Sequence, residues 1–207
     1  MSHLKRKSPG LGLAVELAAQ GFAREVTPEL VIDAKNHLTQ DGTVLTIRHW
    51  LKDIGFLIYR LIEPDILYVI GVHILPQYQG QGLAQALISD LAYRLDAVYL
   101  ALRTQSPLMW RAGSSLCRRG QWYPNPHRDL PAELTPIVAV VATEIGSVYP
   151  VHIGQYGGPL YGKKPVHHDP ALQAWWDSIC NFERGDAVVC VGELPKRASA
   201  YSRIGSW

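Results

Sequence analysis

A glycine loop between two apolar segments holds the residues whose types and spacing could do chemistry. Residues 77–84 read Gln-Tyr-Gln-Gly-Gln-Gly-Leu-Ala, after a strand-like apolar run at 67–75 and before a helix-like run. The first backbone N–H groups of a helix lack an intrahelical partner and, with the helix dipole, attract anions. Gly80 and Gly82 let the backbone approach a pyrophosphate and can adopt positive φ. The loop therefore predicts a site for a phosphate-bearing, nucleotide-like ligand.

The sequence excludes two other known types of glycine-rich phosphate-binding loop. Gln85 stands where a dinucleotide fingerprint needs its third glycine, and residues 82–84 lack the lysine and hydroxyl of a Walker loop. What remains resembles motif A of the GCN5-related N-acetyltransferases (GNAT), Gln/Arg-x-x-Gly-x-Gly/Ala, with Gln77, Gly80 and Gly82 at its fixed positions. Residues 74–76 resemble the family's apolar-x-Pro strand ending. The alternative is a structural glycine turn in an unrelated α/β protein.

The resemblance implies acetyl-coenzyme A or another acyl-coenzyme A as co-substrate. In that family the loop cradles the pyrophosphate, and backbone groups of the preceding strand, here Val72 to Ile74, bind the pantetheine arm. Thr104 or Ser106 stands about where relatives place an asparagine that touches pantetheine. The loop residues implied as binding are Gln77, Gln79, Gly80, Gln81, Gly82, Leu83 and Ala84.

Acid and base candidates depart from the family pattern. Tyr68 occupies the position at which several relatives carry a base, but an unperturbed tyrosine pKa near 10 suits neutral pH poorly. His73 titrates closer to neutrality, although strand alternation turns it to the face opposite Tyr68 unless a bulge intervenes. The family's usual acid is a helix tyrosine, and no tyrosine lies between residues 106 and 122. Tyr123, Cys117 or Ser114 could replace it, and each could instead be a packing residue.

Composition narrows the class of protein. The 207 residues fit one domain or one domain with an extension, and a net charge of +2 with scattered basic residues does not favour a nucleic-acid partner. Three cysteines without a C-x-x-C pair argue against a disulfide framework and a thiolate zinc site, and predict a cytoplasmic protein. No run reaches about 18 apolar residues, so no membrane span is expected. In His167-His168-Asp169 we interpret Asp169 as a helix N-cap and expect no metal.

Apolar periodicity predicts the order of the elements. Helices are expected at 11–22, 28–38, 81–94, 107–119, 135–145 and 170–181, and strands at 43–49, 54–62, 67–75, 97–102 and 187–191. This order resembles the GNAT fold, an α/β (α+β) fold with a mixed, mostly antiparallel central sheet flanked by helices. We expect an unstructured N-terminus (1–10), an acyl-coenzyme A-binding core (11–123) and a C-terminal extension (124–207) that completes the fold and the acceptor site. The Gly/Tyr-rich residues 154–162 should form an ordered loop.

The sequence thus predicts an acyl-coenzyme A-dependent N-acyltransferase, most simply an N-acetyltransferase. It would transfer an acyl group to a small-molecule amine or amino group by direct attack in a ternary complex. The resemblance also implies a homodimer, since the family is often dimeric. Two alternatives stay open: a longer acyl donor, on coenzyme A or an acyl carrier protein, and a binding or regulatory protein with the same fold and little turnover.

Overall fold

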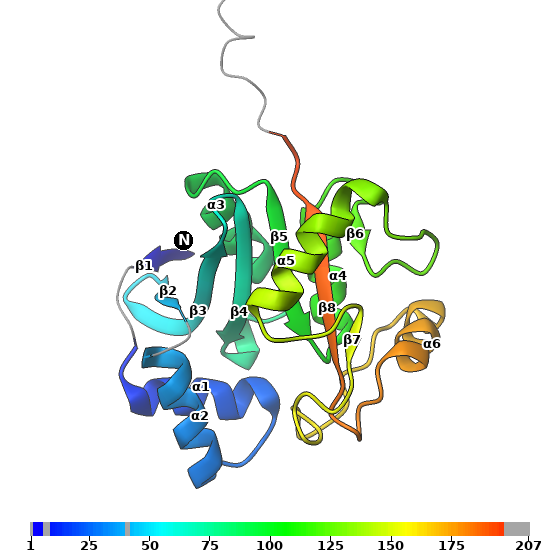
Figure 1. Cartoon of the computed structure of the whole chain (residues 1–207). Coiled ribbons are helices and arrows are strands. Elements are labelled where there is room, and N and C mark those ends of the chain that lie inside the picture. Colours follow the sequence, from blue (N-terminus) through cyan, green and yellow to red (C-terminus); the bar gives the residue numbers. More distant parts are fainter. Residues whose placement is uncertain (1, 6–8, 40–41, 197–207) are drawn as a thin grey trace, which may run out of the picture.

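The chain forms a mixed β-sheet with helices on both faces (Figure 1). The computed structural model describes residues 2–5, 9–39 and 42–196. The strands are β1 (Ser2–Lys5), β2 (Thr43–His49), β3 (Lys52–Ile62), β4 (Ile66–Ile74), β5 (Tyr99–Thr104), β6 (Trp122–Tyr123), β7 (Val151–His152) and β8 (Ala187–Glu193). The helices are α1 (Leu11–Phe22), α2 (Pro28–Thr39), α3 (Leu83–Arg94), α4 (Pro107–Leu116), α5 (Thr135–Glu144) and α6 (Pro170–Ile179), with 3-10 turns η1 (Pro76–Tyr78) and η2 (Ala132–Leu134).

The strand order is β1-β2-β3-β4-β5-β8-β6, and β7 also pairs with β8. β4 and β5 pair in parallel, whereas the other paired neighbours are antiparallel. The predicted mixed, mostly antiparallel α/β fold is therefore confirmed. β8 comes from the C-terminal part of the chain and lies between β5 and β6, so residues 124–207 supply an inner strand of the sheet.

Alternation along the central strands separates two packed faces. Tyr68 of β4 and Val189 of β8 pack with Val141 of α5 on one face. Leu100 of β5 and Cys190 of β8 belong to the larger core that includes side chains of α3 and α4. In Figure 1, α5 lies in front of the sheet, and α3 and α4 lie behind it. Because neighbouring residues of β8 enter different clusters, its nearly continuous apolar sequence follows from burial on both faces.

The start of the chain differs from the expected unstructured segment at 1–10. Residues Ser2–Lys5 form β1, which pairs antiparallel with β2 from Ser2↔His49 to Lys5↔Thr46. Strand pairing uses backbone groups that every non-proline residue carries, so four residues of mixed type give no usable periodicity. Residues 1 and 6–8 of the expected segment lie outside the described residues.

Capping explains where two helices begin. The Leu30 N–H donates to Thr27 Oγ1 at 3.3 Å in the first turn of α2. The Asp169 carboxylate accepts from the N–H groups two and three residues on, at 2.9 and 3.3 Å, which confirms it as the N-cap of α6. These bonds also hold the pKa of Asp169 below its ordinary value. Ser106 precedes α4 without a side-chain capping bond; its N–H donates instead to Thr104 Oγ1 at 3.0 Å.

A buried carboxylate fixes the segment that precedes β8. Asp186 is fully buried and accepts hydrogen bonds from the N–H groups of Gly154 and Asn181, each at 3.0 Å. The Arg184 guanidinium donates to both carboxylate oxygens, at 2.7 and 2.6 Å. The Arg184 bond, followed by those of the two N–H groups, lowers the pKa of Asp186 to about 2 although burial opposes this. Asp186 therefore ties the glycine-rich loop that begins at Gly154 to the sheet.

Replacing this carboxylate should destabilise the fold. We expect Asp186→Asn to lose about 2 kcal/mol of unfolding free energy at pH 7, measured by urea denaturation. Because the pKa is lowered on folding, the stabilisation is complete above the unfolded pKa of about 3.9 and is lost as the pH falls through about 2. The two proteins should therefore converge in acid. The control Asp90→Asn, which removes an exposed ion pair with Arg94, should cost less than about 0.5 kcal/mol; equal losses would contradict this role.

Candidate functional site

β4 and β5 separate along their length, and the candidate site lies where they separate. Ile66–Val69 of β4 pair with Tyr99–Leu102 of β5. Beyond that point β4 stays with β3 up to Ile74, while β5 stays with β8 up to Thr104. Because β4 remains paired with β3 and β5 remains paired with β8, a gap opens between the C-terminal ends of β4 and β5.

A β-bulge at Ile70 changes which residues face the gap. Tyr59 pairs with Val69 and Ile58 pairs with Gly71, so Ile70 is an extra residue on β4. One extra residue reverses the alternation of all residues that follow it. Tyr68 and His73, which would face opposite sides of a regular strand, therefore both line the same cavity.

The backbone groups predicted to hold a pantetheine arm point into the gap. The N–H of Leu75 donates to the Ile54 carbonyl on β3 at 2.9 Å. Because successive residues direct their backbone groups to opposite strand edges, those of Val72 and Ile74 point away from β3. The carbonyl of Ile74 accepts a hydrogen bond from the Gln79 side chain at 2.7 Å, on that side.

The glycine loop follows this strand and leaves open space beside it. Gly80 and Gly82 have φ of 71° and 72°, and a Cβ at either position would meet nothing within 4 Å. Packing therefore does not require glycine here, whereas the positive φ does. Ala86 donates to the Gly82 carbonyl in the first bond of α3, so the N–H groups of residues 83–85 lack an intrahelical acceptor. These N–H groups and the open space beside them could hold a pyrophosphate. Gln81 braces the loop by donating to the Gln77 carbonyl at 3.1 Å.

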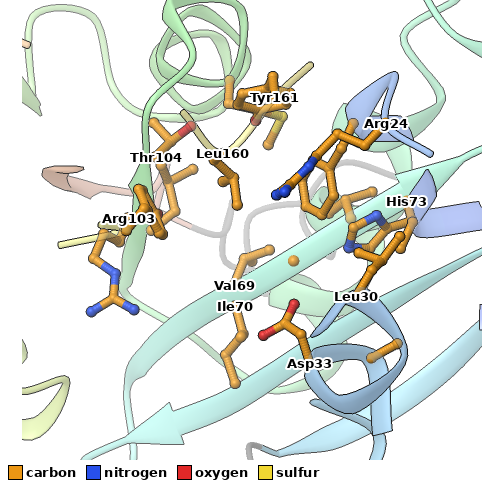
Figure 2. A pocket seen from close by; sticks show the side chains of 18 of the residues that line it. Arg24, Leu30, Asp33, Val69, Ile70, His73, Arg103, Thr104, Leu160 and Tyr161 are labelled. Atoms are coloured by element: carbon orange, nitrogen blue, oxygen red, sulfur yellow. The ribbon is translucent and has the colours of Figure 1, made fainter. Parts of the chain in front are cut away.

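A cavity of about 480 Å³ occupies the gap. Most of its wall comes from β4 between Tyr68 and His73, β5 between Leu102 and Thr104, the α1–α2 corner, and residues 155, 156 and 159–161 of the Gly/Tyr-rich loop. Phe56 of β3 and Met109 of α4 complete the lining. Figure 2 shows His73 on one side and Thr104, Leu160 and Tyr161 on another. The cavity is the size of a small-molecule site.

His73 is held within this wall by aromatic rings. Its imidazole stacks on Phe56 with centroids 4.5 Å apart and meets the edge of Phe22 at 4.9 Å. Gly21 and Gly71 leave room for it, since a Cβ at either would lie 3.4 or 3.3 Å from a ring nitrogen. The side chain is 9% exposed. His73 is thus a positioned residue of the cavity wall.

Tyr161 is a site residue that the sequence interpretation did not identify. Burial raises the pKa of its phenol, while hydrogen bonds with the Thr104 and Ser106 side chains oppose that rise. A phenol with a raised pKa stays protonated at neutral pH and can donate a proton. The sequence offered one sign of this, because residues 154–162 were expected to be an ordered, Tyr-rich loop near the acceptor.

Buried Gln105 positions this loop. Its side chain accepts from the Leu160 N–H at 2.8 Å and donates to the Phe182 carbonyl at 3.0 Å. At the end of the loop, the Gly162 N–H donates to the carbonyl of Phe22, the last residue of α1, at 2.8 Å. The loop therefore spans from β5 to α1 and covers one side of the cavity.

The other predicted site residues lie outside the cavity wall. Tyr123 is 3% exposed on β6, where it pairs with Val191, and it does not line the cavity. The structure therefore separates Tyr123 from Tyr68 and His73, because β8 and β5 stand between β6 and β4. Ser106 is buried next to Thr104, one residue beyond the end of the wall.

The described residues were also searched for metal-ligand clusters and for membrane-spanning helices. No three His, Cys, Asp or Glu side chains there gather in an arrangement that could hold a metal ion. In the same part of the chain, each helix is too short or too polar to cross a membrane.

Comparison with known proteins gives a family match. The model of the Acetyltransferase (GNAT) family matches residues 14–106, whereas no curated protein sequence matches this chain. Among solved structures, the chain is similar to the ribosomal-protein-S18-alanine N-acetyltransferase from Escherichia coli, with 13% identity over 97% of this chain and 98% of that chain and a TM-score of 0.49. It is also similar to a GNAT family acetyltransferase from Elizabethkingia anophelis with acetyl-CoA bound, with 12% identity over 94% and 97% of the two chains and a TM-score of 0.45. Residues 14–106, which include strands β2 to β5 and the glycine loop, thus match the acetyltransferase (GNAT) family.

Proposed function

We propose that the protein is an acyl-coenzyme A-dependent N-acyltransferase that transfers the acyl group directly to an amine. One observation carries this proposal: the open glycine loop follows the strand whose separation from β5 opens the cavity. A ligand with a pyrophosphate at one end and a thin arm at the other fits both features at once. Val72 and Ile74 would bind the arm, and Gly80, Gly82 and the α3 N-terminus would bind the phosphates.

The reaction needs one proton removed and one supplied. The amine lone pair attacks the thioester carbonyl, the C–N bond forms, and the C–S bond then breaks with its electron pair on sulfur. We assign His73 as the base that takes the proton of the amine, since imidazole changes charge near neutral pH. Tyr161 supplies a proton to the leaving thiolate, because burial keeps its phenol protonated.

The cysteines support direct transfer over a covalent acyl-enzyme. Cys117, Cys180 and Cys190 are buried, and none of them lines the cavity. Burial raises the thiol pKa of all three, whereas the thiolate is the nucleophile. We also expect a short acyl group, since about 480 Å³ must hold both the acyl group and the acceptor. A homodimer and a cytoplasmic location stay predictions.

Blocking the loop should abolish coenzyme binding. Acetyl-coenzyme A at about 100 times its Kd should stabilise the wild type by roughly 2.7 kcal/mol in thermal unfolding. Gly82→Trp should remove this shift, because its side chain fills the open space that the phosphates need. Gly146→Trp is a matched control: Gly146 also has positive φ and open space at Cβ, but it follows α5, away from the loop. If no acyl-coenzyme A stabilises the wild type, the coenzyme proposal is wrong; stabilisation without product favours the binding-protein alternative.

Tyr161 and Tyr123 can be compared directly as acids. Tyr161→Phe should lower kcat by about 100-fold, the low end for general acid catalysis because a thiolate leaves readily, with little change in KM for acetyl-coenzyme A. Tyr123→Phe should change kcat by less than about twofold because this side chain is packed on β6. The reverse result in steady-state kinetics would move the acid to Tyr123.

The assignment of His73 as the base is tested by the pH dependence of kcat/KM. For the wild type, kcat/KM should rise with pH across the neutral range, and His73→Gln should lower kcat/KM by about 100-fold and remove that rise. His152→Gln, whose ring contacts Ser147 on the far side of β8, should keep the wild-type profile. Unchanged stabilisation by acetyl-coenzyme A would demonstrate that the His73 variant still folds. An unaltered pH profile in that variant would rule out His73 as the base.

A further inference from the structure

Gln105 is a polar side chain that lies directly after β5 and is buried outside the cavity. It is 2% exposed and, unlike its neighbour Thr104, does not line the cavity. A buried amide without hydrogen-bond partners would cost free energy that an apolar side chain of the same size would not. The partners of Gln105 therefore indicate why a polar group stands here.

The two ends of the Gln105 amide join two segments that lie far apart in the sequence. Its Oε1 accepts from the Leu160 N–H at 2.8 Å, and its Nε2 donates to the Phe182 carbonyl at 3.0 Å. The backbone carbonyl of Gln105 also accepts from Trp176 Nε1 at 3.3 Å. Trp176 belongs to α6 and Phe182 follows that helix. Gln105 thus connects the α6 segment to the Gly/Tyr-rich loop.

The bond to Leu160 lies directly beside the proposed acid. The backbone N–H groups on either side of Tyr161 are both bonded, that of Leu160 to Gln105 and that of Gly162 to the Phe22 carbonyl at 2.8 Å. The Tyr161 ring also meets the Phe22 ring at its edge, with centroids 5.3 Å apart. Of the two backbone bonds, the one to Gln105 uses a side chain, so a substitution can remove it.

The loop depends on such bonds because its own sequence is permissive. The N–H groups of Gly154 and Tyr156 are bonded to residues that precede β8, which fixes the start of the loop. Gly157 and Gly158 follow, with φ of 66° and 153°, and glycine has more conformational freedom than any other residue. The bonds on either side of Tyr161 therefore set the position of its side chain.

We propose that Gln105 is a positioning residue for acyl transfer. By holding the Leu160 N–H, it keeps the Tyr161 phenol at the place from which the phenol gives its proton to the leaving thiolate. This inference rests on the proposed function, because the role of Tyr161 as the acid gives its position a kinetic consequence. A misplacement of about 1 Å can cost about 100-fold in rate, so Gln105 limits kcat although it does not line the cavity.

A double variant separates positioning from general support of the fold. Gln105→Met keeps the length of the side chain and loses both bonds, so it should lower kcat with acetyl-coenzyme A about 10- to 100-fold, with little change in KM. In a protein that already carries Tyr161→Phe, the same substitution should lower kcat by less than about twofold, because the acid is already absent. Trp110→Phe is the matched control: it removes another buried donor to a carbonyl, that of Pro124 at 2.9 Å, and its effect on kcat should be the same in both backgrounds.

Gln105→Glu should restore activity in a manner that depends on pH. A protonated carboxyl group can accept from the Leu160 N–H and donate to the Phe182 carbonyl, as the amide does, whereas a carboxylate has no proton to donate. Burial raises the pKa of a carboxyl group. The kcat of this variant relative to wild type should therefore be highest at the acid end of the working range and fall as the pH rises. The same ratio for Gln105→Met should stay nearly constant.

The position of Tyr161 can also be measured without turnover. In protein labelled with ¹³C at tyrosine Cζ, the Tyr161 resonance is the one that is absent from Tyr161→Phe. Burial raises the pKa of this phenol in the wild type. Gln105→Met should therefore move the resonance and bring its titration closer to the ordinary tyrosine pKa of about 10, whereas Trp110→Phe should do neither.

The outcomes separate this inference from the proposed function. An unmoved Tyr161 resonance in Gln105→Met, or an equal loss of kcat with and without Tyr161→Phe, overturns the role of Gln105 even when acetyl-coenzyme A is turned over. A moved resonance in a protein that turns over no acyl-coenzyme A supports the positioning of Tyr161 and counts against the proposed function. If Gln105→Met does not fold, Gln105→Glu decides: a kcat ratio that does not fall with rising pH overturns the inference.

Discussion

The separation of β4 from β5 is the constraint on which the rest of the site depends. β5 pairs with β4 only as far as Leu102, whereas its other edge is bonded to β8 along its whole length. β4 in turn remains bonded to β3 and absorbs one extra residue at Ile70. The gap therefore forms without leaving either strand unpaired on both edges. It exposes backbone donors and acceptors of β4 in the middle of a sheet, where a ligand arm can bind them as a strand would.

The C-terminal part of the chain builds much of this arrangement. β8 pairs with β5 along its whole length, and Asp186, just before β8, is bonded to Gly154, where the glycine-rich loop begins. That loop carries Tyr161 to Thr104 and ends on α1. The acid that the family resemblance places on the helix after β5 is thus proposed to be Tyr161, which lies 45 residues beyond the end of that helix. A tyrosine on another backbone element can do this because proton donation depends on where the oxygen lies.

Different elements form the parts of the proposed site. The coenzyme end uses backbone groups of β4 and the start of α3, which recognise phosphate and amide shapes without side-chain charge. The α1–α2 corner forms another wall of the cavity, and its backbone is fixed by the left-handed Ala23 and by contact with Gly162. His73 is positioned by Phe22 and Phe56.

Local chemistry determined the elements that the sequence alone predicts. The bounds of α1 and β2 agree with the apolar period, Asp169 caps α6 as expected, and the glycine loop lies between β4 and α3. These features depend on residues a few positions apart, so the sequence contains their cause. The bulge at Ile70, the pairing of Ser2–Lys5, and the approach of Tyr161 to Thr104 depend on partners far along the chain. Only the tertiary structure decided that Tyr68 and His73 share a cavity and that Tyr123 does not, because strand register and loop placement are set by long-range contacts.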